Sequence, residues 1–362
     1  MADGEIKNES NMNTTGGVVQ CLTALMPGRA WGVVLSLAAL SIMGLVLLWY
    51  SPDRSPGIIQ DAWMFKRQAA SLGIGLSAFA LAWMIGWRRW MRAASWLALA
   101  WMALFVIAIC SPQVNPNLSV RLGAVQVNIL VFCPLAVALL LAWIAERIAG
   151  RRTLRVLLVV AAVSAGAVAV WTLDGYEGIA RIFGHESVEK ASPDEVLLRH
   201  WALEASGEAI REANWFSGNR EVLLRNPIPG RCSYSMPFAA AREFGKFFNV
   251  VVLALFGVLA AALACSYRKA GDAAKKVFIA SMGLFILSMV VCGYSAYFGF
   301  VPPMLHTCVP LVSYGGGVVG ITWLVGGILV DLVRDDDVGL RAEARRSDIG
   351  VAGRGEARRS DM

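Results

Sequence analysis

The chain has 362 residues, of which 57% are hydrophobic and 16% are charged, and its formal net charge is +7. Soluble globular domains carry about 25% charged residues, so this composition excludes an ordinary water-soluble enzyme. The positive charge requires no nucleic-acid partner, because no basic-aromatic groove or zinc-ligand spacing accompanies it. The seven cysteines are scattered without a CxxC pair. They indicate small buried side chains rather than a metal site or a disulfide framework.

Uncharged stretches of membrane-spanning length follow one another along the chain. A helix needs about 20 apolar residues to cross the hydrocarbon core of a bilayer. Seven stretches without Asp, Glu, Lys or Arg have this length: 30–50, 68–87, 93–120, 122–145, 156–173, 247–267 and 277–330. The last is long enough for two helices, near 277–293 and 309–332, because Pro302 and Pro303 interrupt it. The sequence therefore predicts an all-α polytopic membrane protein with about eight transmembrane helices and one long extracytoplasmic loop.

Clusters of Arg and Lys predict the orientation. If the N-terminus is cytoplasmic, every inside loop carries positive charge, as the positive-inside rule requires. The clusters are Arg88, Arg89 and Arg92, then Arg147, Arg151, Arg152 and Arg155, then Arg268, Lys269, Lys275 and Lys276, then the tail. We expect a bacterial inner (cytoplasmic) membrane protein with both termini cytoplasmic. Its parts are a disordered cytoplasmic N-terminus (1–28), membrane helices 1–5 (29–173), an extracytoplasmic loop (174–246), membrane helices 6–8 (247–332) and a cytoplasmic tail (333–362).

A short motif near the C-terminus gives the first indication of function. The run VPLVSYGGG at 309–317 resembles the PFxSYGGSS signature of the SEDS family, the FtsW, RodA and SpoVE type proteins of peptidoglycan synthesis. The matching residues are Pro310, Ser313, Tyr314, Gly315 and Gly316. A glycine triplet at the start of a membrane helix also lets two backbones approach closely, so packing alone is an alternative explanation.

Five further segments resemble the family and occur in the family's order. They are GLVLLWYSP (44–52) with FKRQ (65–68), VRLGAVQVN (120–128), GYEGIARIFG (175–184) and SYSMPFAAAREFG (233–245). These are similar to the family's GLVMVYSAS and FxxRQ, RWIxLGxxxxQPSE, YRxxRIxxFLDP and TDFIFAVIGEELG. No single segment is specific, but their order and the predicted topology together make the resemblance fairly specific. The family's PDLG-bearing span is missing, which reduces its ten-helix plan to eight.

The resemblance implies a glycosyltransferase that polymerises lipid II at the outer face of the membrane, in cell division or cell-shape maintenance. Such a reaction needs a carboxylate to accept a proton and cations to hold the diphosphate leaving group. The family's catalytic Asp aligns with Tyr234, whose phenol has an ordinary pKa of about 10 and cannot act as that base. Glu243 is the remaining candidate for the catalytic carboxylate, and its alternative role is a helix-start acid.

The candidate substrate-binding residues are Arg67, Gln68, Arg121, Arg181, Arg231, Ser313, Tyr314, Gly315 and Gly316. The arginines suit a diphosphate because guanidinium matches phosphate geometry, although interfacial arginines are also common anchors. The resemblance implies no cofactor and no metal. It implies lipid II as substrate and a single-pass transpeptidase, a class B penicillin-binding protein, as partner.

Two other functions stay open beside polymerisation. The first is a non-catalytic membrane scaffold of the division or elongation complex, which keeps the fold and has lost the base. The second is a lipid-precursor transporter, which should place a polar path through the bilayer centre. The spans contain almost no intramembrane charge, and this ranks the transporter last.

Overall fold

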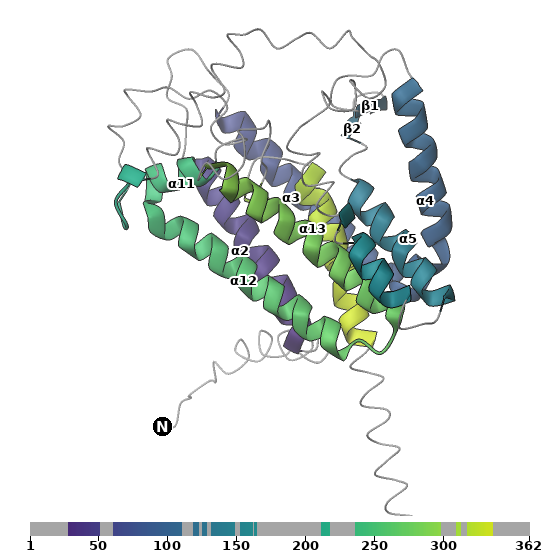
Figure 1. Cartoon of the computed structure of the whole chain (residues 1–362). Coiled ribbons are helices and arrows are strands. Elements are labelled where there is room, and N and C mark those ends of the chain that lie inside the picture. The colour runs from purple at the N-terminus through teal and green to yellow at the C-terminus, as the bar shows by residue number, and fades with distance from the viewer. Residues whose placement is uncertain are drawn as a thin grey trace, which may run out of the picture.

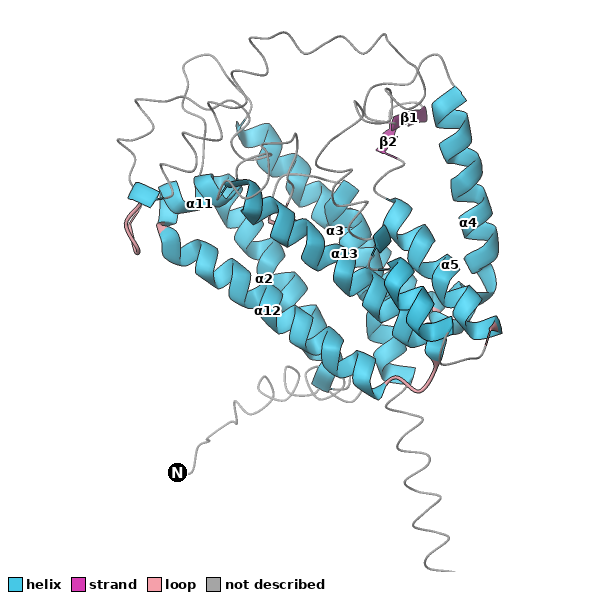
Figure 2. Cartoon of the chain, in the orientation of Figure 1, coloured by secondary structure: helices cyan, strands magenta, loops and turns pink. Residues whose placement is uncertain are grey.

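Helices make up nearly all of the residues that the structure, a computed structural model, describes (Figure 2). It describes residues 28–50, 61–110, 119–122, 125–128, 132–148, 153–161, 163–164, 211–217, 236–297, 309–312 and 317–335. Five helices in these ranges are long and apolar enough to cross a membrane: Ala30–Tyr50, Phe65–Ile85, Lys246–Lys269, Ala273–Ser295 and Gly317–Asp335. The polytopic helical architecture expected from the sequence is confirmed. The total of eight helices includes stretches outside the described residues.

The named elements in chain order are α2 (Gly28–Tyr50), α3 (Asp61–Ile85), α4 (Trp87–Cys110), β1 (Ser119–Leu122), β2 (Val125–Asn128), α5 (Cys133–Arg147), α11 (Met236–Phe244), α12 (Lys246–Lys269) and α13 (Ala273–Tyr297). The helix Gly317–Asp335 is called the C-terminal helix below. In Figure 1 the long helices lie side by side, with α12 at one edge of the bundle and α4 at the other. α12 packs on α2 and α13, and α13 packs on α5, which in turn packs on α4.

The C-terminal helix lies in the core, against α2 and α3. The indole N–H of Trp323 donates a hydrogen bond to the Ser41 hydroxyl at 3.1 Å, and the Trp323 ring meets Phe79 edge-on. Gly327 faces the backbone of Phe79 so closely that a Cβ would collide with its carbonyl oxygen. Small residues allow membrane helices to approach at this distance, which explains why this end of the chain is rich in glycine.

One predicted span differs from the observed elements. The uncharged stretch 122–145 was predicted to be one transmembrane helix, but α5 covers only Cys133–Arg147. The segment 111–121 was predicted to lie outside the membrane, and α4 ends just before it, at Cys110. Between α4 and α5, β1 and β2 form an antiparallel hairpin in which Val120 pairs with Val127. At 1.5 Å per residue, the 15 residues of α5 span roughly 22 Å, less than the hydrocarbon thickness of about 30 Å. The expectation that 122–145 is one full-length span is therefore wrong.

A tight junction joins α3 to α4. Gly86 separates the two helices and has φ +80°. Glycine suits this place because a positive φ is strained for any residue with a Cβ. The Asp331 carboxylate, from the C-terminal helix, accepts a hydrogen bond of 2.6 Å from the first backbone N–H of α4, at Trp87. A carboxylate satisfies a free N–H group at a helix N-terminus and interacts favourably with the helix dipole. The charged end of the C-terminal helix thus fixes where α4 begins.

Candidate functional site

The last turn of α2 contacts two elements that carry predicted site residues. These are the start of α3, with Arg67 and Gln68, and the end of α11, with Glu243. Trp49 contacts Phe65 of α3 with 5.1 Å between ring centroids. The next residue, Tyr50, contacts Phe244 of α11 at 5.7 Å. Both ring pairs are edge-on, a favoured arrangement for aromatic side chains. The start of α3 and the end of α11, far apart in sequence, therefore lie at the same end of the bundle on two sides of α2 (Figure 1).

Glu243, the candidate catalytic residue, lies in the last turn of α11. Its side chain is partly exposed, and the following Phe244 stacks on Phe248 of α12 at 5.0 Å. The alternative role, an acid just before the start of the sixth helix, stays open, because Glu243 lies two residues before Gly245, the residue that precedes α12. Glu243 is therefore a partly exposed carboxylate at one end of the bundle.

A segment of the long loop holds the junction between α11 and α12. Gly245 has φ +82° and ψ 178°, a conformation essentially restricted to glycine. The first backbone N–H groups of α12, at Lys246 and Phe247, donate hydrogen bonds to the carbonyls of Asn214 and Trp215 at 2.9 and 3.0 Å. The free N–H groups of the helix start are thus satisfied by backbone carbonyls. Residues 211–217 are thereby attached to the start of α12, which follows Glu243 by three residues.

The structure brings together two of the segments that resemble the SEDS family. Leu311 and Val312, just before the SYGGG run, form a buried turn in which Leu311 has φ +66°. A Cβ built on Gly44 of α2 would lie 2.5 Å from the Leu311 carbonyl oxygen and 2.9 Å from the Val312 Cα. Gly44 is the first residue of GLVLLWYSP. The close approach of its backbone to the turn is a physical reason for glycine at this place in the motif.

The other described candidates lie on two elements. Arg67 and Gln68 are in the second turn of α3, where Arg67 is exposed and Gln68 is buried. A buried polar side chain in a membrane helix faces protein rather than lipid. Arg121 is in β1 and pairs with Gln126 of β2 in the hairpin register.

The remaining candidates lie outside the described residues and stay predictions. They are Arg181, Arg231, Ser313, Tyr314, Gly315 and Gly316, together with Tyr234.

The structure adds a buried polar pair that was not among the predicted site residues. The Tyr294 hydroxyl of α13 donates a hydrogen bond of 3.1 Å to the Asn249 side-chain oxygen of α12. Both residues are buried, and a Cβ on the neighbouring Gly293 would lie 3.0 Å from Val309 at the start of the buried turn. The lone Asn in an otherwise apolar span was the available sequence signal, because polar residues in membrane helices usually have partners.

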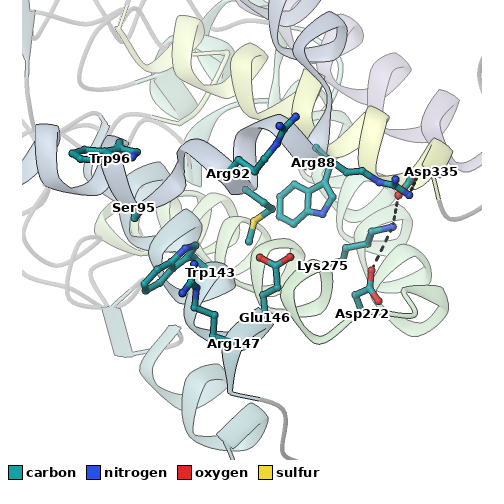
Figure 3. A pocket seen from close by; sticks show the side chains of 12 residues that line it. Arg88, Arg92, Ser95, Trp96, Trp143, Glu146, Arg147, Asp272, Lys275 and Asp335 are labelled. Carbon is teal, nitrogen blue, oxygen red and sulfur yellow. Dashed lines mark hydrogen bonds and ion pairs between the residues drawn. The ribbon is translucent and has the colours of Figure 1, made fainter.

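The predicted positive clusters meet at the opposite end of the bundle. Arg88 and Arg92 from α4, Arg147 from α5 and Lys275 from α13 line one cavity there, of about 860 Å³ (Figure 3). The Lys275 ammonium contacts the Asp335 carboxylate of the C-terminal helix at 2.9 Å. Three of the loops that were predicted to lie on the cytoplasmic side thus meet at one end of the structure. Loops on one side of a membrane must lie at one end of a helical bundle, so this arrangement agrees with that prediction.

Comparison with known proteins finds similarity in structure but not in sequence. No protein-family model matches the sequence, and no curated protein matches it. The rod shape determining protein RodA of Thermus thermophilus is 21% identical with a TM-score of 0.54, and the alignment covers 84% of this chain and 97% of that chain. An Asp-to-Ala mutant of the same protein gives a TM-score of 0.56 at the same identity and coverage.

A third solved structure concerns coordination of polymerization and crosslinking by a peptidoglycan synthase complex. It is 22% identical to this chain with a TM-score of 0.62, and the alignment covers 84% of this chain and 98% of the other. At these identities the similarity establishes the fold and not the chemistry. The likeness extends over almost the whole length of each solved chain, so it describes the complete helical bundle rather than one shared helix pair. The chain therefore has the polytopic membrane fold of RodA, a SEDS protein.

Proposed function

We propose that this protein acts in bacterial peptidoglycan synthesis as a divergent SEDS-type membrane protein that handles lipid II at the outer face of the inner membrane. The observation that carries the proposal is the packing of Gly44, in one SEDS-like segment, against Leu311 and Val312, in another. Two weak resemblances more than 260 residues apart in sequence thus form one contact in a RodA-like fold.

The proposed reaction is glycan-strand elongation. A carboxylate accepts the proton of the attacking sugar hydroxyl, the new glycosidic bond forms at the anomeric carbon, and the undecaprenyl diphosphate leaves. Glu243 is the proposed base, because it is partly exposed at the end of α11 where the polar part of the substrate would lie. Arg67, exposed on α3 on the other side of α2, is the proposed contact for the diphosphate.

We expect the purified full-length protein to convert lipid II into glycan strands with no other polymerase present, and Glu243→Gln to reduce the rate about 100-fold, the usual contribution of a general base. Gel separation of labelled product measures this rate. Glu212→Gln is the matched control, because Glu212 is an exposed carboxylate in the attached segment 211–217 and should keep full activity. Tyr234→Asp should raise the rate if Tyr234 occupies the position of the family's base. Equal activity of the wild type and Glu243→Gln would exclude Glu243 as the base.

The second candidate function is a non-catalytic scaffold in the same complex, and the observation that favours it is the Tyr234 alignment. In this case the protein would position a single-pass transpeptidase of the class B penicillin-binding type without forming glycan itself. Glu243→Gln would then leave growth and cell shape unchanged at normal protein level. A complete absence of glycan product, under conditions in which a SEDS polymerase works, would select this function.

The proposed orientation places both termini in the cytoplasm and residues 174–246 outside. Alkaline phosphatase fused after residue 200 should be active, because this enzyme folds only outside the cytoplasm. The same enzyme fused after residue 150 or 270 should be inactive, and a cytoplasmic fluorescent reporter at these two positions should be bright. The inverse pattern would place the cavity at the outer face and remove lipid II chemistry from the Glu243 end.

A further inference from the structure

The cavity at the charged end of the bundle has no role in the proposed glycan chemistry. It is lined by the first turns of α4, the last turns of α5, the junction between α12 and α13, and the end of the C-terminal helix (Figure 3). Its volume of about 860 Å³ falls in the usual range for small-molecule sites, about 300–1,000 Å³. The question is which ligand its chemistry suits.

The charges in the cavity divide into a paired group and a remaining group. Lys275 is buried and held by Asp335 at 2.9 Å and Asp272 at 4.0 Å. Arg88 also reaches Asp335, at 3.9 Å. The carboxylates of Asp272 and Asp335 are therefore already paired with cations. Glu146 is the remaining carboxylate of the lining.

Two guanidinium groups make up the remaining positive charge. No ion pair joins Arg92 or Arg147 to a carboxylate in the part of the chain that the structure describes. Arg147 lies over the ring of Trp143, 4.3 Å from the ring centroid, which orients the guanidinium while leaving its edge available. A guanidinium is planar and donates paired hydrogen bonds, so it suits the oxygens of a phosphate group.

An exposed apolar stripe runs from this charged site along α4. Arg92 is followed by Trp96, Leu99 and Met102, at spacings of three or four residues that place them on one face of the helix. Their side chains are 75%, 62% and 49% exposed. A cationic side chain next to an exposed apolar stripe is the arrangement that a phospholipid binding site needs. The headgroup fits the cavity, and an acyl chain fits the stripe.

We propose that this cavity binds an anionic phospholipid of the leaflet facing it, with the headgroup phosphate between Arg92 and Arg147 and an acyl chain along Trp96 and Leu99. Basic pockets between membrane helices are a known mode of anionic-lipid recognition. Inorganic phosphate has the same anionic oxygens, but it has no acyl chain to contact the exposed stripe. The proposal rests on the membrane location and is independent of the glycan chemistry.

The test is native mass spectrometry of the full-length protein, released from detergent after incubation with cardiolipin, phosphatidylglycerol or phosphatidylethanolamine. We expect the wild type to retain the two anionic lipids, and Arg92→Gln with Arg147→Gln to weaken their binding about 30-fold, because the phosphate loses its hydrogen bonds to two charged groups. Arg89→Gln with Arg155→Gln is the matched control. It removes the same charge from two exposed arginines and should change binding in detergent less than about twofold, because neither residue lines the cavity.

Two further variants distinguish a lipid site from diffuse electrostatic attraction to the protein surface and from a site for free phosphate. Glu146, exposed at the cavity, repels an anion, so Glu146→Gln should strengthen binding of anionic lipid. Trp96→Ser should weaken lipid binding without affecting inorganic phosphate. Equal loss in the two arginine pairs would overturn the proposal in favour of diffuse surface attraction. Displacement of bound lipid by millimolar phosphate would overturn it in favour of a free-phosphate site.

Discussion

Gly44→Ala is expected to destabilise the protein by about 3 kcal/mol, the upper end of the cost for overpacking a core, since the new methyl group meets backbone atoms that cannot rotate away. The Cβ would lie 2.5 Å from the Leu311 carbonyl oxygen and 2.9 Å from the Val312 Cα. Either α2 or the buried turn must move. Because the turn leads into the SYGGG run, we expect a lower thermal unfolding midpoint in detergent and also lower polymerase activity at equal protein amount.

Gly257→Ala is the matched control for this prediction. Gly257 lies in the middle of α12, and a Cβ built on it meets nothing within 4 Å. Its replacement by Ala should change stability by less than about 1 kcal/mol and in the favourable direction, because alanine restricts the unfolded chain and suits a helix. If Gly44→Ala and Gly257→Ala unfolded at the same temperature, the close contact between α2 and the turn would be refuted.

Gly245→Ala is expected to detach the loop segment 211–217 from the start of α12 and to destabilise the protein by about 3 kcal/mol. Two effects add. Ala at φ +82° is strained, and its Cβ would lie 2.6 Å from the Trp215 carbonyl oxygen and 2.7 Å from that of Asn214. These are the carbonyls that accept the first N–H groups of α12. Limited proteolysis should then cleave within 211–217, and the unfolding midpoint should fall.

Gly271→Ala provides the comparison, because Gly271 joins α12 to α13 at the other end of the same helix and a Cβ there meets nothing within 4 Å. It should leave both the cleavage pattern and the unfolding midpoint close to those of the wild type. Protection of 211–217 in Gly245→Ala, equal to that in Gly271→Ala, would contradict the attachment of this segment. Because Glu243 is two residues from Gly245, the same variant also tests whether the attached segment supports activity.

The helices were the most predictable part of the structure. The stretches 30–50 and 247–267 correspond closely to α2 and α12, because a backbone in lipid must satisfy its hydrogen bonds internally and only an uncharged helix of this length does so. The hairpin at 119–128 was missed. The spans were predicted from the absence of charge and from length, and neither criterion distinguishes a strand from a helix. The alternation of Val120, Val125 and Val127 with polar or charged residues was the sequence signal for a strand.

The candidate site was predictable only in part. Sequence order placed Glu243 after the long loop and Arg67 near the start of the second helix, and the elements that carry them meet the same end of α2. The aromatic contacts through Trp49 and Tyr50 that connect these two regions were not predictable. They depend on how three helices tilt against one another, and no local pattern encodes this.

By itself the sequence determined that the chain is a helical membrane protein, since hydropathy and charge act residue by residue against the bilayer. It also predicted which loops share a side of the membrane and showed motifs that resemble those of the SEDS family in the same order. Only the tertiary structure decided which segments meet. It placed Gly44 against the turn at Leu311, the carbonyls of Asn214 and Trp215 on α12, and Arg92 and Arg147 in the lining of one cavity. Lipid is as apolar as the helix surfaces, so burial does not select these partners. Close backbone packing and a few polar contacts select them, and both exist only once the helices have assembled.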